Sequence, residues 1–203
     1  MRIGLTGGIG SGKSTVSAML ARCGAAIVDT DAIGRRLTAA GGAAMPAVRQ
    51  AFGDAIIGAD GALDREAMRA RAFSDPSAKQ RLEALLHPLI GAEALREAAV
   101  STSRVLVFDV PLLAESPHWR ARVNRILVID CRHATQIERV AQRAGWTHDA
   151  AERVIASQAS RAARRSIADA VIFNDGIDLA TLEAAVSGLW SLWQPPAQDP
   201  VEQ

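Results

Sequence analysis

A glycine-rich stretch with a single lysine lies near the start of the chain. It reads GLTGGIGSGKST over residues 4–15 and meets the spacing G-x-x-x-x-G-K-[ST] at Gly7, Gly12, Lys13 and Ser14. In such a loop the glycines let backbone N–H groups point inward at phosphate oxygens, the lysine reaches the β- and γ-phosphates, and the Ser14 hydroxyl ligates magnesium. The stretch therefore predicts a nucleoside-triphosphate site with Mg²⁺, whose contacts come from Gly8, Ile9, Gly10, Ser11, Gly12, Lys13, Ser14 and Thr15.

The lysine of this loop stands out against the rest of the composition. Among the 23 basic residues only Lys13 and Lys79 are lysine, and the others are arginine. A chain that uses arginine for ordinary positive charge but keeps lysine here indicates a site that needs a compact ammonium group rather than a planar guanidinium. We therefore expect Lys13 to take part in the chemistry as well as in binding.

Acidic residues follow two of the apolar segments. Asp29 and Asp31 lie at the end of segment 26–29, and their i, i+2 spacing aims both carboxylates the same way if the extended backbone continues. Either residue alone suits the N-cap of the next helix, but a pair opposite a phosphate loop favours one carboxylate as a general base. Asp109 ends segment 105–109, where an acid holds magnesium directly or through water, unless it only serves the turn after the strand.

A second group of charged residues is basic. The segment 133–167 is rich in arginine, and Arg139 and Arg143 lie four residues apart on one face of a helix. Most arginines on a helix are simply solvated. In a mobile lobe, however, several of them suit closure over the charge that develops on a transferring phosphoryl group. We therefore predict a lid at 133–167, with Arg139 and Arg143 as its catalytic residues.

Five short apolar segments predict the buried strands that position these residues: 2–5, 26–29, 105–109, 125–129 and 170–173. Helical stretches separate them, which favours an α/β fold with helices on both faces of a parallel sheet. In the long insertion after the second strand, the clearest helix begins at Asp75-Pro76, and we expect Pro88 to kink it. We predict one domain over 1–203, with a helical acceptor-binding lobe at 32–101, the lid at 133–167 and a disordered tail at 195–203.

Composition and charge exclude several classes of partner. The chain has 203 residues, 49% of them hydrophobic and 22% charged, and a net charge of +1, which predicts neither nucleic acid nor an anionic membrane as a partner. No apolar run approaches the roughly 18 residues that span a bilayer, and no signal segment is recognisable. Cys23 and Cys131 lack metal-site spacing, which indicates a reducing compartment. We expect a cytoplasmic protein that is a monomer or a weak homo-oligomer.

Two classes of phosphate-loop protein compete at this point: a switch that hydrolyses GTP and a small-molecule kinase. The tetrapeptide DAIG at 31–34 matches the D-x-x-G of a switch, but it follows the glycine loop too soon, and the guanine-binding N-K-x-D is absent from the sequence. A large helical insertion after the second strand suits a lobe that binds the phosphoryl acceptor. The kinase interpretation is therefore favoured.

Several motifs in sequence order resemble the dephospho-CoA kinase family. They are LTGGIGSGKST, VDTD, LLHPLI, VFDVPLL followed by Glu115, and QASRAARRSIADAVIFNDG, and the likeness runs from residue 3 to residue 176, loosest over 36–75. The resemblance implies a five-stranded sheet in the order 2-3-1-4-5, a helical coenzyme-binding lobe and an arginine-bearing lid. It also implies ATP-dependent phosphorylation of the ribose 3′-hydroxyl of dephospho-CoA, the last step of coenzyme A synthesis. The alternative is a nucleoside or nucleotide kinase with the same sheet and lid.

The resemblance also implies roles for individual residues. It makes Asp31 the general base and Asp29 its partner, and it places Asn174 and Gly176 near the adenine of ATP. A histidine such as His87 is more often structural, but the family pattern places it in the acceptor pocket. The chain departs from the family at Ala114, where a bulkier residue is common, and at IFND, where IDNS or IDNN is more usual. The predicted acceptor-binding residues are Asp29, Asp31, His87, Asp109, Pro111, Leu112 and Arg161, and the predicted magnesium ligands are Ser14 and Asp109.

Overall fold

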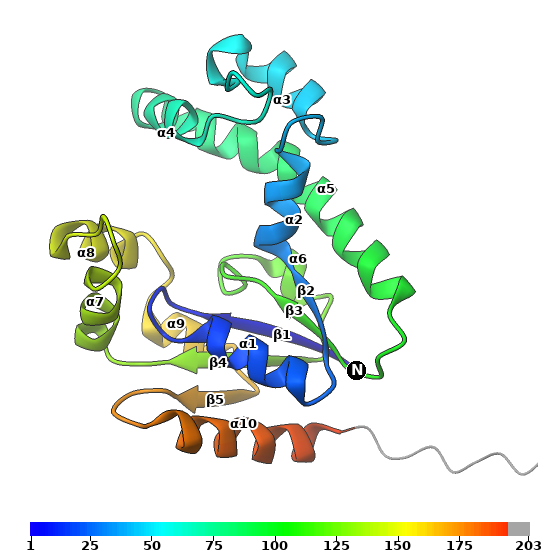
Figure 1. The fold of residues 1–203 in the computed structure, drawn as a ribbon, viewed down its shortest axis with the longest axis vertical. Coiled ribbons are helices and arrows are strands. Elements are labelled where there is room, and N and C mark those ends of the chain that lie inside the picture. The colour runs from blue at the N-terminus through cyan, green and yellow to red at the C-terminus, as the bar shows by residue number, and fades with distance from the viewer. Residues whose placement is uncertain (195–203) are drawn as a thin grey trace, which may run out of the picture. The chain divides into compact units, whose positions relative to one another are not determined.

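A computed structural model describes residues 1–194 of the chain, so the predicted tail at 195–203 lies outside the described residues. The chain divides into two compact units. The first unit combines Met1–Val28 with the chain from Ser101 onward, and the second is Asp29–Val100. Figure 1 shows the elements of both units.

The first unit is built on a parallel sheet of five strands. The strands are β1 (Arg2–Gly7), β2 (Ala26–Asp29), β3 (Leu106–Asp109), β4 (Arg125–Asp130) and β5 (Ala170–Phe173), and their spatial order is β2-β3-β1-β4-β5. The order implied by the family resemblance is therefore confirmed. Since β1 is central, the residues that follow it lie at the middle of the carboxyl edge of the sheet, where ligands of open α/β sheets bind.

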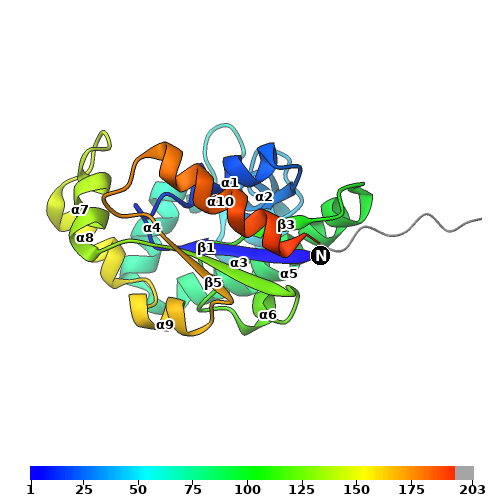
Figure 2. The ribbon, with the colours of Figure 1, turned by 90° about the horizontal axis from the view of Figure 1, so that it is seen from below.

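Helices cover both faces of this sheet (Figure 2). Helices α1 (Lys13–Arg22) and α10 (Leu179–Trp193) lie on one face, and α6 (Pro117–Arg120) and α9 (Arg161–Ser166) lie on the other. Alternate residues of β1 face opposite ways: Ile3 and Leu5 belong to the core cluster under α1 and α10, whereas a Cβ built on Gly4 would meet Leu113 on the other face. Burying each such aliphatic side chain contributes roughly 1.5–3 kcal/mol, which explains the apolar strands.

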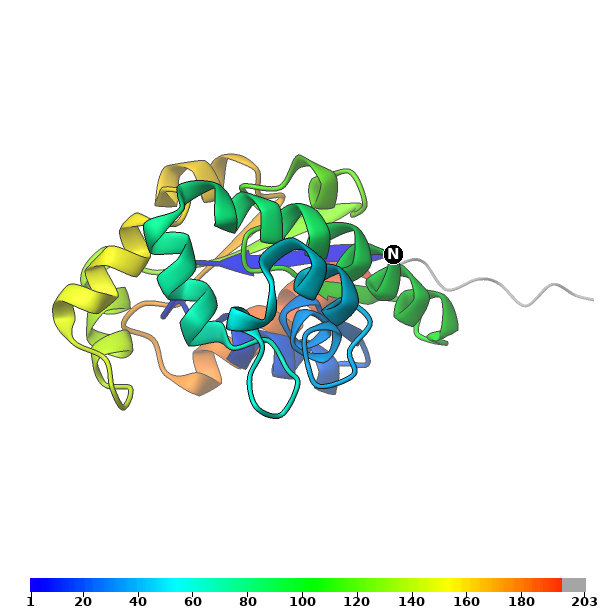
Figure 3. The same ribbon diagram turned by 90° about the horizontal axis from the view of Figure 1, so that it is seen from above.

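Two further helices of the first unit occupy most of the segment predicted as a lid. Helices α7 (His133–Ala141) and α8 (His148–Ala156) lie side by side in Figure 3 and pack together. The hydroxyl of Thr147 accepts a hydrogen bond from Ala150 N and so caps α8, and Ser160 caps α9 in the same way. Local capping residues therefore define where these helices begin.

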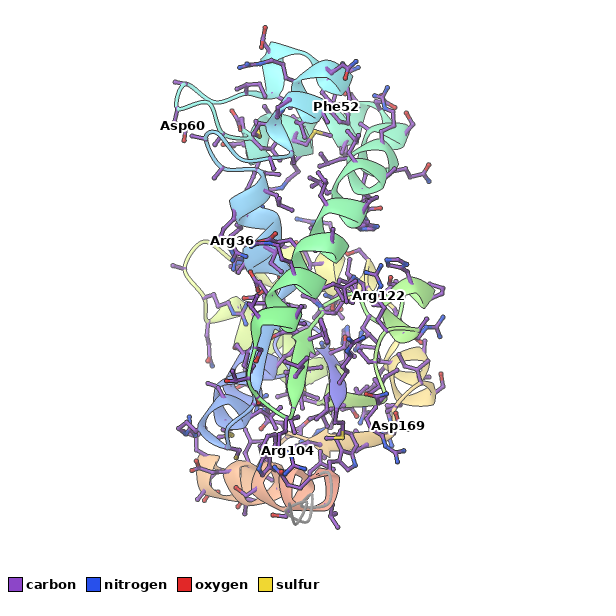
Figure 4. The ribbon with its side chains drawn as sticks, turned by 90° about the vertical axis from the view of Figure 1, so that its right-hand side faces the viewer. Arg36, Phe52, Asp60, Arg104, Arg122 and Asp169 are labelled. Carbon is purple, nitrogen blue, oxygen red and sulfur yellow. The ribbon has the colours of Figure 1, made fainter. Side chains whose placement is uncertain are left out.

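The second unit is helical, with its own small core. It contains α2 (Thr30–Leu37), α3 (Met45–Phe52), a 3₁₀ turn at Asp54–Ile56, α4 (Arg65–Ser74) and α5 (Pro76–Val100). Ala44, Val48 and Met68 are buried at its centre, and Arg81 lies over the ring of Phe52. Figure 4 labels Phe52. Helix α5 begins where the sequence predicts and continues through Pro88 to Val100.

A buried carboxylate ties the end of β5 to the start of α7. Asp175 accepts hydrogen bonds from the backbone N–H of Arg132 at 2.6 Å and from its Nε and Nη2 at 3.0 and 2.8 Å, and Thr135 Oγ1 lies 3.1 Å from both carboxylate oxygens. These bonds, the Arg132 guanidinium first among them, hold the pKa of Asp175 well below its usual range. The ionised carboxylate therefore contributes to the stability of the fold.

We expect Asp175→Asn to lower Tm at neutral pH, with a penalty that shrinks in acid. Because the folded-state pKa is depressed, the stabilisation is complete above the unfolded pKa of about 3.9 and is lost as the pH falls through the folded-state value. The Tm difference between wild type and variant should therefore be largest near pH 7 and decrease below about pH 4. Thermal unfolding followed by circular dichroism measures it, with Asp149→Asn on the exposed first turn of α8 as control. A Tm difference independent of pH would contradict this.

Candidate active site

The glycine loop after β1 takes a conformation that only glycine allows at its end. Gly12 has φ of +92° and immediately precedes α1, whose first turn has no side-chain cap. A Cβ built on Gly12 would lie 2.3 Å from Nδ2 of Asn174, which donates a hydrogen bond of 2.8 Å to Ser11 O. Any side chain at this position would displace Asn174. The loop and the residue after β5 are therefore fitted to each other.

Lys13 pairs with Asp109 at the carboxyl end of β3. The two side chains are 19% and 8% exposed, so this ion pair is largely removed from solvent. A buried carboxylate without a cation would be strongly destabilising, so Lys13 stabilises the fold as well as placing an ammonium in the loop. The structure thus brings together two residues that the sequence predicts for the phosphate site from separate motifs.

The same loop borders a cavity of about 370 Å³ in the first unit. The predicted loop residues Gly10, Gly12, Ser14 and Thr15 line it, together with Asn174. The predicted lid residues Arg139 and Arg143 also line it. The remaining lining residues follow the NDG sequence of residues 174–176, and sequence reasoning missed them. They are Ile177, Asp178, Leu179 and Leu182. The cavity therefore combines backbone N–H groups, two guanidinium groups and an apolar side.

Residues of the predicted lid hold the tip of the loop by its backbone. Gln136 Nε2 donates to Ile9 O at 2.7 Å, and Gln158 Oε1 accepts from Ile9 N at 3.0 Å. Arg139 Nη1 donates to Gly10 O at 3.3 Å. Sequence reasoning missed both glutamines, because nothing local to them indicates a partner more than 100 residues away. Both polar backbone groups of Ile9 are thus satisfied by side chains.

Arg161, predicted to bind the acceptor, forms an ion pair inside the first unit. Its Nε and Nη2 donate to the carboxylate of Asp130, the last residue of β4, at 2.8–2.9 Å, and its guanidinium lies 5.4 Å from the ring centre of Phe173. The Asp130 side chain is 2% exposed, so Arg161 supplies the cation that this buried carboxylate needs. Glu115 accepts a hydrogen bond of 2.7 Å from Ala159 N and so holds the backbone just before α9.

Asp29 and Asp31 lie in different surroundings, because β2 ends at Asp29 and α2 begins at Thr30. Asp29 is the N-cap of α2, and its Oδ1 accepts from Ala32 N at 2.9 Å. The extended backbone does not continue past Asp29, so the expectation that strand alternation aims both carboxylates the same way is wrong. Asp31 lies in the first turn of α2, is exposed, and lines a second cavity of about 290 Å³ within the second unit.

The other predicted acceptor residues lie in different surroundings. His87 is exposed on α5 and does not line the second cavity. Pro111 and Leu112 follow β3 in the first unit; Pro111 O accepts a hydrogen bond from Thr6, and the Leu112 side chain is exposed. Gly176 is exposed, with φ of +69°. Acceptor contacts of these residues stay predictions.

The residues around the loop fit the Mg²⁺ that a triphosphate brings. Ser14 exposes its hydroxyl to the cavity, and Asp109 offers a carboxylate at the same edge of the sheet. These are hard oxygen donors, as Mg²⁺ requires. Over residues 1–194 no group of three or more His, Cys, Asp or Glu is placed to hold a metal alone. Phosphate oxygens and water would complete the coordination, which is the usual arrangement for Mg²⁺ with a nucleotide.

A parallel sheet in this order, a glycine loop leading into α1 and a lysine beside a strand-end carboxylate define a P-loop kinase. The family model described as dephospho-CoA kinase matches residues 1–179. The chain therefore belongs to the dephospho-CoA kinase family. No helix within residues 1–194 is long and apolar enough to cross a membrane.

Curated relatives agree with this assignment, and solved structures share the fold. The dephospho-CoA kinase of Bordetella pertussis is 54% identical over 193 residues, covering 95% of this chain and 90% of the relative, and that of Albidiferax ferrireducens is 52% identical over 189 residues, covering 92% and 89%. The crystal structure of TT1252 from Thermus thermophilus aligns with a TM-score of 0.82 at 30% identity, covering 96% of this chain and 98% of that one. Shikimate kinase from Bacteroides thetaiotaomicron shares the fold alone, with a TM-score of 0.55 at 17% identity, covering 95% and 97%.

We expect Lys13→Met to reduce kcat/KM for ATP by at least about 100-fold, because a charge aimed at the transferring phosphoryl group is removed. The same change should lower Tm, because Asp109 loses the cation that pairs with it. Steady-state kinetics and thermal unfolding measure the two effects. Lys79→Met is the matched control: Lys79 is exposed, 3.8 Å from Glu83 on α5, and its loss should leave both quantities unchanged. Wild-type turnover in Lys13→Met would contradict the assignment.

Proposed function

We propose that the chain transfers the γ-phosphoryl group of ATP to the ribose 3′-hydroxyl of dephospho-CoA, the last step of coenzyme A synthesis. In this reaction the hydroxyl oxygen bonds to the γ-phosphorus, the bond from that phosphorus to the β–γ bridging oxygen breaks, and ADP leaves. Membership of the dephospho-CoA kinase family, with relatives of that name above 50% identity over nine-tenths of the chain, is the observation that carries the choice of acceptor.

On the ATP side, N–H groups of residues 8–15 would bind the phosphates, apart from those of Ile9 and Ser11, which donate to Gln158 Oε1 and Gly8 O. Lys13 would reach the β- and γ-phosphates. Ser14 and Asp109 would hold Mg²⁺, which neutralises charge on the phosphate oxygens when bound. Arg139 and Arg143 line the cavity of about 370 Å³ beside the glycine loop. We assign them to the γ-phosphate at the moment of transfer. Asn174 and Gly176, after β5, would lie beside the adenine.

On the acceptor side, Asp31 is the better of the two candidate bases. Asp29 Oδ1 is occupied by the cap of α2, and its Oδ2 lies 3.7 Å from Arg35. Asp31 presents its carboxylate to a cavity large enough to admit part of the acceptor. We assign Asp31 to orient the 3′-hydroxyl and accept its proton, and Asp29 to fix the helix turn that carries Asp31.

We also propose that the chain works in the cytoplasm, as its free thiols suggest. Cys131 is buried, and burial raises the pKa of its thiol to about 11, so it stays protonated at neutral pH. A protonated buried thiol behaves as a small core side chain rather than as a redox group.

We expect dephospho-CoA to be phosphorylated in preference to other acceptors. ADP release coupled to NADH oxidation, with MgATP and each of dephospho-CoA, adenosine, AMP and a panel of nucleosides and monophosphates, measures the preference directly. The kcat/KM for dephospho-CoA should exceed that of every other acceptor by at least about 100-fold, the ratio that roughly 3 kcal/mol of differential transition-state binding produces. A nucleoside or monophosphate as the best acceptor would instead establish a nucleoside or nucleotide kinase.

We expect Asp31→Asn to lower kcat by about 10²–10⁴-fold while the Kd for ATP and for dephospho-CoA stays near the wild-type value, because the amide keeps the shape but not the basicity. Asp29→Asn should be milder, since an amide oxygen still caps the helix. Asp60→Asn is the control: Asp60 is an exposed carboxylate in a loop of the same unit (Figure 4). If Asp31→Asn stayed within tenfold of wild type (roughly 1.4 kcal/mol) and Asp29→Asn were inactive, the base would be Asp29.

A further inference from the structure

The cavity beside Asp31 has a polar side and an apolar side. It lies wholly within the Asp29–Val100 unit, and its polar side chains come from α2 and from Arg65 at the first residue of α4. Its apolar side chains are Leu63, Leu82, Leu86 and Ile90, three of them from α5. A ligand that fits this cavity needs both charged or polar groups and apolar groups.

One face of α2 supplies three of the polar groups. Asp31, Arg35 and Thr38 are spaced i, i+4 and i+7, which places them on the same side of a helix. At 1.5 Å rise per residue, the positions of Asp31 and Thr38 lie about 10 Å apart along the helix axis. The carboxylate is thus at one end of a row that continues with a guanidinium and then a hydroxyl.

Arg65 reaches this row from a different helix. Its Nη2 donates to Thr38 Oγ1 at 3.2 Å, and Thr38 Oγ1 in turn donates to Gly34 O at 2.8 Å. The backbone fixes the approach, since Leu63 N donates to Thr38 O at 2.9 Å. Thr38 is 3% exposed, so the Arg65 guanidinium donates to a buried hydroxyl that is itself hydrogen-bonded to the backbone.

The stability of the unit does not explain a cation at this position. Arg65 is the first residue of α4, where the helix dipole favours negative rather than positive charge. Over residues 1–194 no carboxylate lies within 4 Å of its guanidinium, whereas Arg36 on α2 pairs with Glu97 and Arg81 on α5 pairs with Asp75. Arg65 is therefore a positioned guanidinium that lacks a protein anion in this part of the chain.

We propose that Arg65, with Arg35 beside it, binds the diphosphate of the phosphoryl acceptor. The inference rests on the proposed function, because it takes dephospho-CoA as the acceptor. That molecule presents, in order, a ribose hydroxyl, a 5′-diphosphate and a pantetheine arm with apolar stretches. The cavity presents the Asp31 carboxylate and two guanidinium groups on its polar side, and leucine and isoleucine side chains on its apolar side. A planar guanidinium binds phosphate oxygens through two parallel N–H groups, so Arg65 selects acceptors that carry the diphosphate.

Replacement of Arg65 tests the proposal. Arg65→Ala should raise KM for dephospho-CoA by about 10- to 100-fold, as expected for the loss of a hydrogen-bonded charge, while kcat and KM for ATP stay within about threefold. Arg65→Lys keeps the positive charge but not the two parallel N–H groups of the guanidinium, so its KM for dephospho-CoA should lie between those of wild type and Arg65→Ala. Arg69→Ala is the matched control, because Arg69 lies one turn further along α4, is exposed and does not line the cavity.

A direct binding measurement separates contact with the diphosphate from a structural role. Calorimetry gives Kd for dephospho-CoA at several salt concentrations, with a non-hydrolysable ATP analogue saturating the other nucleotide site. An ionic contact makes binding weaken with salt, so Arg65→Ala should show a shallower dependence of log Kd on log salt than wild type. Unchanged KM and salt slope in an active enzyme would overturn the proposal, as would an equal loss of ATP binding. Failure of the wild-type chain to phosphorylate dephospho-CoA would instead overturn the proposed function.

Discussion

The close approach of three separate segments to the glycine loop is the constraint on which the first unit depends. A Cβ on Gly7 would lie 2.7 Å from Ile129 O at the end of β4, and a Cβ on Gly8 would lie 2.3 Å from Gln136 Nε2 on α7. Asn174 after β5 closes on Gly12 in the same way, so a side chain at Gly7, Gly8 or Gly12 would have to displace one of these neighbours. The glycines therefore serve two purposes: they free N–H groups for phosphate, and they let the ends of two strands and the first helix of the predicted lid pack on the loop.

Buried carboxylates at the carboxyl edge of the sheet organise the charge around this loop. Asp109, Asp130 and Asp175 end or closely follow β3, β4 and β5, and each pairs with a cation from another segment, namely Lys13, Arg161 and Arg132. Each pair offsets the cost of burying its carboxylate and fixes a positive group near the phosphate site. The three cations are thus oriented by protein carboxylates, and Lys13 is in addition largely removed from solvent. This preorganisation reduces the reorganisation that transfer requires.

How much the sequence predicts depends on how local each feature is. The strand ranges agree to within a residue or two, because strands buried on both faces are continuous apolar runs. The glycine loop is predictable because its spacing lies within one short stretch of sequence.

Contacts between distant parts of the chain are not predictable in this way. The contact of Gln158 with Ile9 joins residues 149 positions apart, and no pattern near either residue predicts it. Arg65 lies in the part of the chain where the family resemblance is loosest, and its contact with Thr38 and its place in the cavity lining are visible only in the folded chain. The spacing of Asp29 and Asp31 fits either a strand continuation or a helix start, and the Asp29 cap decides in favour of the helix.

The distribution of arginine and lysine follows from what each group does in the folded chain. Arg132 and Arg161 each engage one carboxylate through two guanidinium nitrogens, which a flat, rigid fork achieves and a single ammonium does not. Lys13 meets Asp109 through its single side-chain nitrogen. A compact ammonium on a flexible stem can exchange a carboxylate for a phosphate oxygen by rotation about its own bonds, whereas a guanidinium held by two parallel bonds must break both. A chain that otherwise uses arginine for nearly all its positive charge therefore has lysine where the proposed function requires a cation that can move from a carboxylate to a phosphate.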